Sequence, residues 1–222
     1  MTTAVKICGI NNRSSLDAAL TGGADFVGLV FFAKSPRHLS LAEAQALREV
    51  VSGQGLCRTV ALVVDAADDA LAEIIATVDP DCLQLHGHET VDRVAHIRTM
   101  FRKPILKAVP VTSATDVEPA LRYYAPGQVA DILLFDAKPD PSALLPGGNG
   151  LAFDWHALDG LAARIPFALA GGLTPANVAQ AIALTGASIV DVSSGVESAP
   201  GVKNPALIRR FLHNAKAAKQ AS

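Results

Sequence analysis

The sequence predicts an α/β protein, a single (βα)₈ TIM barrel that spans residues 1–222. Short runs of β-branched residues alternate with Ala- and Leu-rich helical patterns, as in proteins built from repeated βα units around a parallel sheet. These units recur about every 20 to 35 residues, and neither a linker nor a change in composition divides them. A doubly wound open sheet is the alternative. That fold usually has a Gly-rich turn after its first strand, and Cys8-Gly9-Ile10-Asn11 is not such a turn.

Strands are expected where β-branched and aliphatic residues gather in short runs. They cover 5–10, 25–32, 59–65, 82–86, 105–109, 131–136, 167–170 and 188–192. A helical pattern follows each strand, at 14–21, 41–52, 68–78, 90–101, 115–123, 155–164, 175–184 and 205–218. Two helix starts are well marked, because Thr174-Pro175 and Asn204-Pro205 each place an N-cap residue before a proline at the first helical position.

The composition agrees with a globular intracellular enzyme. The net charge is −2, 18% of the residues are charged and 50% are hydrophobic, and a chain of 222 residues buries a core without help from a metal or a disulfide. Basic residues are dispersed before the tail at 209–219, so nucleic acid is not an expected partner. The charge-free stretch 165–190 contains glycines, a proline and polar side chains. It therefore predicts strand, loop and buried helix, and not a membrane span.

The cysteines bear on the cell compartment. Cys8, Cys57 and Cys82 lack CxxC spacing, so neither a disulfide framework nor a zinc site is expected, and Cys57 and Cys82 are interpreted as structural. A reducing cytoplasm is the simplest compartment, and the first residues show no signal-peptide pattern. No strongly apolar exposed helix face is evident, which favours a monomer.

Strand parity sorts the polar residues of the strands. Alternate positions face the barrel lumen, and the polar residues that share this parity near the strand ends are Lys6, Cys8, Gln84, His86, Lys107, Asp136, Asp191 and Ser193. The residues between them are apolar and would face the helices: Ile7, Leu83, Leu85, Leu133 and Phe135. Buried polar groups are costly unless they bond to each other or to a ligand. A polar pocket at the carboxyl ends of the strands is therefore expected.

The last two βα loops carry a second signal. Gly171 and Gly172 follow the seventh strand, and Ser193, Ser194 and Gly195 follow the eighth. In this architecture these two loops commonly bind phosphate through backbone N–H groups, and glycine lets the backbone approach the anion. A Gly-Gly pair alone is more often just a turn, but small residues in both loops predict a phosphate site.

Six motifs in this order resemble phosphoribosylanthranilate isomerases of tryptophan biosynthesis, and the resemblance spans nearly the whole chain. The motifs are Lys6-Ile7-Cys8-Gly9-Ile10, Ser35-Pro36-Arg37, Gln84-Leu85-His86-Gly87, Leu134-Phe135-Asp136, Ala170-Gly171-Gly172-Leu173 and Asp191-Val192-Ser193-Ser194-Gly195-Val196-Glu197. The resemblance implies a (βα)₈ barrel without a cofactor. It implies an Amadori rearrangement of N-(5′-phosphoribosyl)anthranilate to 1-(2-carboxyphenylamino)-1-deoxyribulose 5-phosphate.

The resemblance also implies residue roles. Asp136 matches the general acid, Cys8 the general base, and Arg37 the residue that pairs with the anthranilate carboxylate. We expect perturbed pKa values for Cys8 and Asp136. On the residues alone, a buried free cysteine is usually a small hydrophobe and a loop arginine is usually solvated. Gln84 and His86 either bond the substrate or satisfy each other.

Two further features invite a function. His86 and His88 are two residues apart, but no third and fourth ligand is evident, so no metal is expected. Residues 138–151 form a Pro- and Gly-rich loop directly after Asp136, and long loops at this face often act as lids. Asn149 lies in its glycine tract, where related chains often have a threonine, and both residues offer a short polar side chain.

Two other functions remain open. A non-catalytic phosphate-binding barrel would keep the glycine loops but would not need Cys8 or Asp136, and both are present. Another sugar-phosphate isomerase would share the phosphate site but not Arg37.

Overall fold

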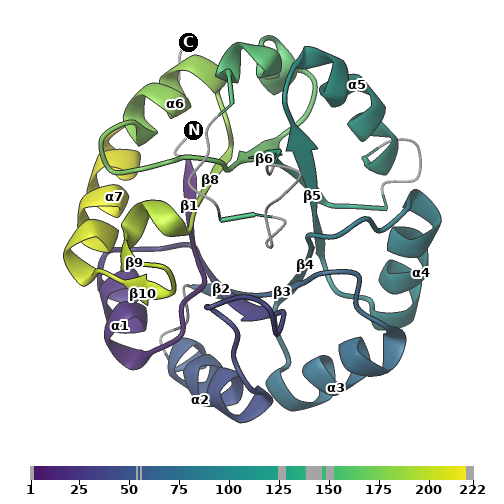
Figure 1. Ribbon diagram of the computed structural model, residues 1–222, viewed down its shortest axis with the longest axis vertical. Helices are drawn as coiled ribbons and strands as arrows, with labels where there is room; N and C mark the ends of the chain where they lie inside the picture. Colours follow the sequence, from purple (N-terminus) through teal and green to yellow (C-terminus); the bar gives the residue numbers. More distant parts are fainter. Residues whose placement is uncertain are drawn as a thin grey trace.

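The computed structural model describes residues 3–53, 55, 57–124, 129–138, 147–148 and 153–218. Eight parallel strands form a closed barrel in sequence order, and β1 pairs with β8 to complete it (Figure 1). The strands are β1 Ala4–Cys8, β2 Phe26–Phe31, β3 Arg58–Val63, β4 Cys82–Leu85, β5 Ile105–Val111, β6 Ile132–Ala137, β7 Phe167–Leu169 and β8 Ile189–Val192. The predicted TIM barrel is confirmed, and the open-sheet alternative is wrong because closure leaves no sheet edge.

Helices surround the barrel (Figure 1). The α-helices are α1 Arg13–Thr21, α2 Leu41–Ser52, α3 Asp68–Val78, α4 Val91–Phe101, α5 Val117–Ala120, α6 Val178–Thr185 and α7 Pro205–Ala217. The cap at the start of α7 is as predicted, because the Asn204 side chain accepts from the N–H groups of Ala206 and Leu207. Helix α6 instead begins after a turn at 175–177, in which the Asn177 side chain accepts from the N–H of Thr174. The predicted start at Pro175 was therefore wrong.

Two predicted helices are short and broken. The segment 115–123 divides into the 3₁₀ turns Ala114–Asp116 and Leu121–Tyr123 around α5. The segment 155–164 forms the 3₁₀ turns Trp155–Leu158 and Leu161–Ala163, and Gly160 between them has a φ of 75°. That left-handed conformation interrupts any continuous α-helix, which explains why the predicted helix is absent.

A small antiparallel hairpin after β8 was not predicted. It joins β9 Glu197–Ala199 to β10 Val202–Lys203 and lies between the barrel and α7 in sequence. Its strands have three and two residues, too short for a period-2 pattern to be visible in the sequence. The hairpin matters because Glu197 and Lys203 are buried beneath the mouth of the barrel.

The core has two layers. The larger one lies between the strands and the helices and includes Ile7, Leu83, Leu85, Leu133 and Phe135, as strand parity predicts. A smaller cluster fills the lumen, as in other barrels of this class. It consists of Phe26, Val60, Cys82, Leu106, Ala108, Leu134, Ala168, Ala170 and Ile189. Because this cluster fills the lower part of the lumen, an open pocket can form only toward the carboxyl ends of the strands.

The amino ends of alternate strands share one stabilising contact. Asp25, Asp81 and Asp131 precede β2, β4 and β6, and each accepts a hydrogen bond from a backbone N–H of the preceding strand, at 2.7, 2.7 and 2.8 Å. The aspartate N–H in turn donates to the carbonyl of the same residue, at 2.9 to 3.0 Å. These pairs fix the register of neighbouring strands at the face opposite the pocket. Among the described residues, no helix is long and apolar enough to cross a membrane.

Candidate active site

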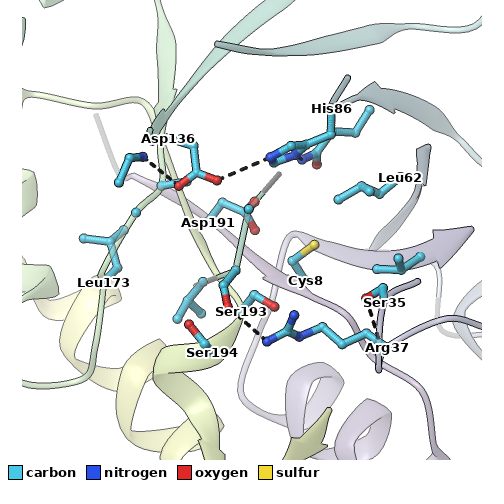
Figure 2. A pocket seen from close by; sticks show the side chains of 18 of the residues that line it. Cys8, Ser35, Arg37, Leu62, His86, Asp136, Leu173, Asp191, Ser193 and Ser194 are labelled. Carbon is cyan, nitrogen blue, oxygen red and sulfur yellow. Dashed lines mark hydrogen bonds and ion pairs between the residues drawn. The ribbon is translucent and has the colours of Figure 1, made fainter. Parts of the chain in front are cut away.

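A pocket opens at the carboxyl ends of the strands (Figure 2). It lies where barrel enzymes carry their chemistry. The structure brings all the predicted site residues to its lining, namely Cys8, Arg37, Gln84, His86, Asp136, Gly171, Gly172, Ser193, Ser194 and Gly195. They come from both ends of the sequence, and closure of the barrel places them around one space.

Lys107 was assigned to the lumen, and that prediction was wrong. Its neighbours Leu106 and Ala108 belong to the lumen cluster, so alternation turns Lys107 toward the helices. There it forms a buried ion pair with Glu89 at 2.7 Å and donates to the carbonyl of Gly87 at 2.8 Å. A buried lysine on a strand therefore did not mark the active site, because a carboxylate outside the barrel pairs with it.

Cys8 lies at the end of β1 and is buried. Lys6, two residues earlier on the same parity, is fully buried and forms an ion pair with Asp191 of β8, at 3.0 and 3.1 Å to the two carboxylate oxygens. Burial raises the pKa of the Cys8 thiol, and the nearby charge of Lys6 acts in the opposite direction. The pKa of Cys8 is thus perturbed as expected, but upward. The resting group is a thiol whose ionisation depends on nearby positive charge.

Asp136 lies near the end of β6, facing His86, which directly follows β4 (Figure 2). The distance from His86 Nε2 to Asp136 Oδ2 is 3.4 Å, and the other carboxylate oxygen accepts from the N–H of Ala137 at 2.8 Å. Gln84 and His86 also bond to each other, at 2.9 Å between Nε2 and Nδ1. Among the described residues, Gln84 Oε1 is buried and has no hydrogen-bond partner. The two side chains thus bond to each other, and Gln84 Oε1 remains available to accept a hydrogen bond from a ligand.

Arg37 is buried, so the interpretation as a solvated loop residue is wrong. Its Nε and Nη2 donate to the two carboxylate oxygens of Glu197 at 2.7 and 2.9 Å. Its stem packs on Gly9, where a Cβ would lie 2.5 Å from Arg37 Cδ. Within the described part of the chain, Nη1 donates no hydrogen bond. A planar cation held in this way is suited to bind an anionic group in the pocket.

The loops after β7 and β8 present backbone to the pocket. Gly171 and Gly172 have φ values of 82° and 63°, a conformation that side chains resist. A Cβ on Gly195 would lie 1.9 Å from the carbonyl oxygen of Leu173, so the two loops are in direct contact. Lys203 supports the second loop from below, donating to the backbone carbonyl and the hydroxyl of Ser193 at 3.0 and 3.3 Å. This arrangement is suited to an anion such as phosphate.

Two further predictions concern a metal site at His86 and His88 and a lid at 138–151. The described residues contain no group of three or more His, Cys, Asp and Glu side chains placed to hold a metal ion, and the His88 side chain is 95% exposed and pairs with Asp65. Asn149 and most of the predicted lid lie outside the described residues. Gly147 is described, and a Cβ there would lie 2.5 Å from His86 Nε2 and 2.8 Å from Asp136 Oδ2. Gly147 therefore lies close to His86 and Asp136.

Comparison with known proteins now gives the family. Residues 5–214 match the family model described as N-(5′-phosphoribosyl)anthranilate (PRA) isomerase. The chain belongs to this isomerase family. The match covers far more than half of the chain, and it agrees with the resemblance that the six motifs show.

Individual relatives agree with the family. The chain is 52% identical over 218 residues to the N-(5′-phosphoribosyl)anthranilate isomerase of Rhodopseudomonas palustris (strain BisA53), covering 98% of each chain. Among solved structures, the isomerase of Thermotoga maritima aligns with a TM-score of 0.85 and 33% identity over 97% of this chain and 99% of that one. A family structure in complex with reduced 1-(o-carboxyphenylamino)-1-deoxyribulose 5-phosphate aligns with a TM-score of 0.82 and 32% identity, with the same coverage.

Sequence reasoning missed three residues of the site. Glu197 closes the last motif but was given no role, although a carboxylate next to a glycine loop could have suggested a partner for a cation. Lys203 and Gly28 gave no signal, because their importance depends on which residues they meet in space. A Cβ on Gly28 would lie 2.8 Å from Cys8 Sγ and 3.0 Å from Lys6 Nζ. Small size at this position keeps room for both groups.

Proposed function

We propose that this family member converts N-(5′-phosphoribosyl)anthranilate into 1-(2-carboxyphenylamino)-1-deoxyribulose 5-phosphate with Cys8 as general base and Asp136 as general acid. The observation that carries the proposal is that both groups line one pocket, on strands β1 and β6, together with Arg37 and the two glycine loops. Such a pocket can hold an acid, a base, a carboxylate and a phosphate around one sugar.

The acid acts first. Asp136 donates its proton to the ribose ring oxygen while the bond from that oxygen to C1′ breaks, and the anthranilate nitrogen supplies the electron pair that forms an iminium. The ring opens and Asp136 is left as a carboxylate. His86, 3.4 Å from Asp136, is placed to donate a hydrogen bond to that carboxylate.

The base acts second. The Cys8 thiolate removes the proton from C2′, and the C–H electron pair forms a double bond to C1′ that neutralises the iminium. The resulting enolamine takes a proton at C1′, and its hydroxyl at C2′ becomes the ketone. C1′ is reduced and C2′ is oxidised, so the enzyme is an intramolecular oxidoreductase of the aldose-ketose type.

Each set of binding residues is assigned to one chemical group of the substrate. We assign the anthranilate carboxylate to Arg37 and the phosphate to the N–H groups of the loops at Gly171-Gly172 and Ser193-Ser194-Gly195. Gln84 keeps a free buried acceptor, which is suited to a sugar hydroxyl. These three contacts would place C1′ and C2′ between the acid and the base.

The assembly state and compartment form part of the same proposal. We assign residues 1–222 to one domain that acts as a monomer in the cytoplasm. Among the described residues, the large hydrophobic side chains that are exposed are Met100, Leu184 and Val202, and each lies on a different element, so no single element presents a row of them. Light scattering on the purified protein should give the chain mass of 23.0 kDa, and twice that mass would overturn the monomer.

The activity is tested by the loss of anthranilate fluorescence when purified protein meets freshly made N-(5′-phosphoribosyl)anthranilate. Loss with the wild type, abolished in both Cys8→Ala and Asp136→Asn, supports the reaction and the two roles. Retained activity in either variant overturns that residue's role. Phosphate-dependent binding without any loss of fluorescence would identify a non-catalytic phosphate-binding barrel. An unchanged KM in Arg37→Ala would favour another sugar-phosphate isomerase.

A further inference from the structure

Lys6 is a fully buried lysine in the lumen, and it does not line the pocket itself. Burying an ammonium group costs several kcal/mol unless nearby groups compensate. Asp191 supplies one carboxylate, with both oxygens within 3.1 Å of Nζ. Because Lys6 does not line the pocket, it does not contact a bound substrate, and its direct contacts reach the pocket through a neighbouring side chain.

That neighbour is Cys8. Lys6 Nζ and Cys8 Sγ lie 3.0 and 2.8 Å from the same point, the position of a Cβ on Gly28, so the two atoms are at most 5.8 Å apart. An opposite charge within about 4 to 6 Å stabilises an ionised group and shifts its pKa by about 1 to 3 units. Gly28 is the residue that leaves room for this approach.

We propose that Lys6 is a positioning residue for the base Cys8: its ammonium group holds the positive charge against which the thiolate forms, and Asp191 limits this effect by sharing the same ammonium. The inference rests on the proposed function, because it assigns a task to the environment of the base. It explains why a lysine occupies the lumen directly beneath a cysteine. It also predicts that Lys6 and Asp191 act on the cysteine in opposite directions.

The other charges around Cys8 are consistent with this assignment. Lys203 approaches from β10 but is paired with Glu197 at 2.7 Å, and the guanidinium of Arg37 is paired with the same carboxylate. Asp136 on β6 and His86, which directly follows β4, face each other across the lumen. Lys6 is therefore the cation whose counter-ion, Asp191, competes directly with the thiolate.

The charge state of Lys6 supports the same conclusion. Burial lowers the pKa of Lys6, but the negative charge of Asp191 and the contact with Cys8 outweigh it, so the pKa is raised overall. The raised pKa favours the ammonium form of Lys6. Burial raises the pKa of Asp191, and the charge and hydrogen bonds of Lys6 act to lower it, so each group of the pair favours the charged form of the other. Without the carboxylate, the thiolate becomes the counter-ion.

The experiment measures the rate at which iodoacetamide alkylates Cys8 as a function of pH, read by peptide mass spectrometry. Cys57 and Cys82 in the same molecule are internal controls, because neither contacts Lys6. Lys6→Met should raise the apparent pKa of Cys8 by at least about 1 unit, a tenfold loss of rate at neutral pH. Asp191→Asn should lower the apparent pKa, and Lys6→Arg should stay closer to wild type than Lys6→Met.

Opposite shifts in Lys6→Met and Asp191→Asn support the proposal, because loosened packing would change Cys8 in the same direction in both. Shifts of the same sign, or none, overturn it. If Lys6→Met does not fold, Asp191→Asn decides alone: a lowered pKa supports the proposal, and an unchanged or raised one overturns it. Alkylation needs no substrate, so the result is independent of whether the isomerase assay succeeds.

Discussion

Arg37 and Glu197 form a buried two-point ion pair, with Nε and Nη2 of the guanidinium 2.7 and 2.9 Å from the two carboxylate oxygens. The pair joins the loop after β2 to the hairpin of β9 and β10. Lys203 contacts the same carboxylate at 2.7 Å and also donates to the carbonyl of Ser193 in the loop after β8. One carboxylate therefore links the residue assigned to the anthranilate group with the loop assigned to the phosphate.

Glu197→Gln should raise KM for N-(5′-phosphoribosyl)anthranilate about tenfold and leave kcat within about threefold. The amide keeps the volume but offers a single acceptor oxygen, so the guanidinium loses its fixed orientation, and a charged hydrogen bond contributes about 1.5 to 3 kcal/mol. Steady-state kinetics on Glu197→Gln, Arg37→Ala and the double variant would measure the coupling. A lower KM in Glu197→Gln would instead mean that Glu197 competes with the substrate for Arg37.

Arg37→Ala should raise KM for the natural substrate by about 100-fold, because a charge-assisted hydrogen bond from a guanidinium to a carboxylate contributes about 1.5 to 3 kcal/mol in a buried site. Inhibition by ribulose 5-phosphate, which carries the phosphate but no anthranilate carboxylate, should be nearly unchanged. Competition assays on wild type and variant give both constants. Equal weakening of both ligands would show that Arg37 supports the whole pocket and does not select the carboxylate.

The sequence was sufficient to predict the position of a site residue where the local pattern and the contacts in space agree. Cys8 and Asp136 were placed correctly because strand alternation fixes which face a residue takes once the strand is recognised. Lys107 was misplaced because polarity was used as a guide to the lumen, and its partner Glu89 lies outside the barrel. A polar residue on a strand therefore indicates a pocket only after its possible partners have been excluded.

Contacts between distant segments could not be predicted. Arg37 and Glu197 are separated by 160 residues, and nothing near Arg37 in the sequence shows that it is buried. The importance of Gly28 likewise depends on two side chains of another strand. Such tertiary contacts override local preferences. At 155–164 the predicted helix is instead interrupted by the left-handed backbone of Gly160.

Gly28→Ala should lower kcat by about tenfold or more while the fold and KM are retained. The added Cβ would lie 2.8 Å from Cys8 Sγ, closer than atoms of this kind approach, so the thiol must move away from the C2′ proton. A displacement of a catalytic group by about 1 Å can lower the reaction rate about 100-fold. Gly53→Ala is the matched control, since a Cβ there meets its nearest atom at 3.7 Å and should not affect activity. Equal kcat in both variants would contradict the prediction.

Lys107→Met should destabilise the protein by about 3 kcal/mol or more, because it leaves the buried carboxylate of Glu89 without its cation. Both side chains are almost fully buried, at 4% and 2% exposure. Lys107→Met combined with Glu89→Gln should recover part of that loss, since no unpaired charge remains. Urea unfolding of the single and double variants measures the difference. The Glu89 carboxylate also accepts hydrogen bonds from the N–H groups of Asp65 and Gly87. A double variant less stable than Lys107→Met would mean that these bonds contribute more than the ion pair.

Asp131→Asn should lower the free energy of unfolding by about 0.5 to 1 kcal/mol at neutral pH, a modest value because the pair with Arg98 is partly exposed to solvent. Burial acts to raise the pKa of Asp131, but the hydrogen bonds from Arg98 and from the Ile105 N–H outweigh it, so the pKa is lowered overall. A carboxyl group whose pKa is lower in the folded state stabilises the protein above its unfolded pKa, near about 4. That contribution is lost as the pH falls through the folded pKa. The difference between wild type and Asp131→Asn should therefore shrink below about pH 4.

Glu118→Gln is the control for this pH dependence. Glu118 makes the same two-point contact with Arg164, but both side chains are at least half exposed and no strand N–H is bound. Its removal should change stability by less than that of Asp131, since an exposed pair contributes little. Urea unfolding across acidic pH compares the two variants. Equal losses would show that the contact to β5 adds nothing and that the aspartates before alternate strands act only as surface ion pairs.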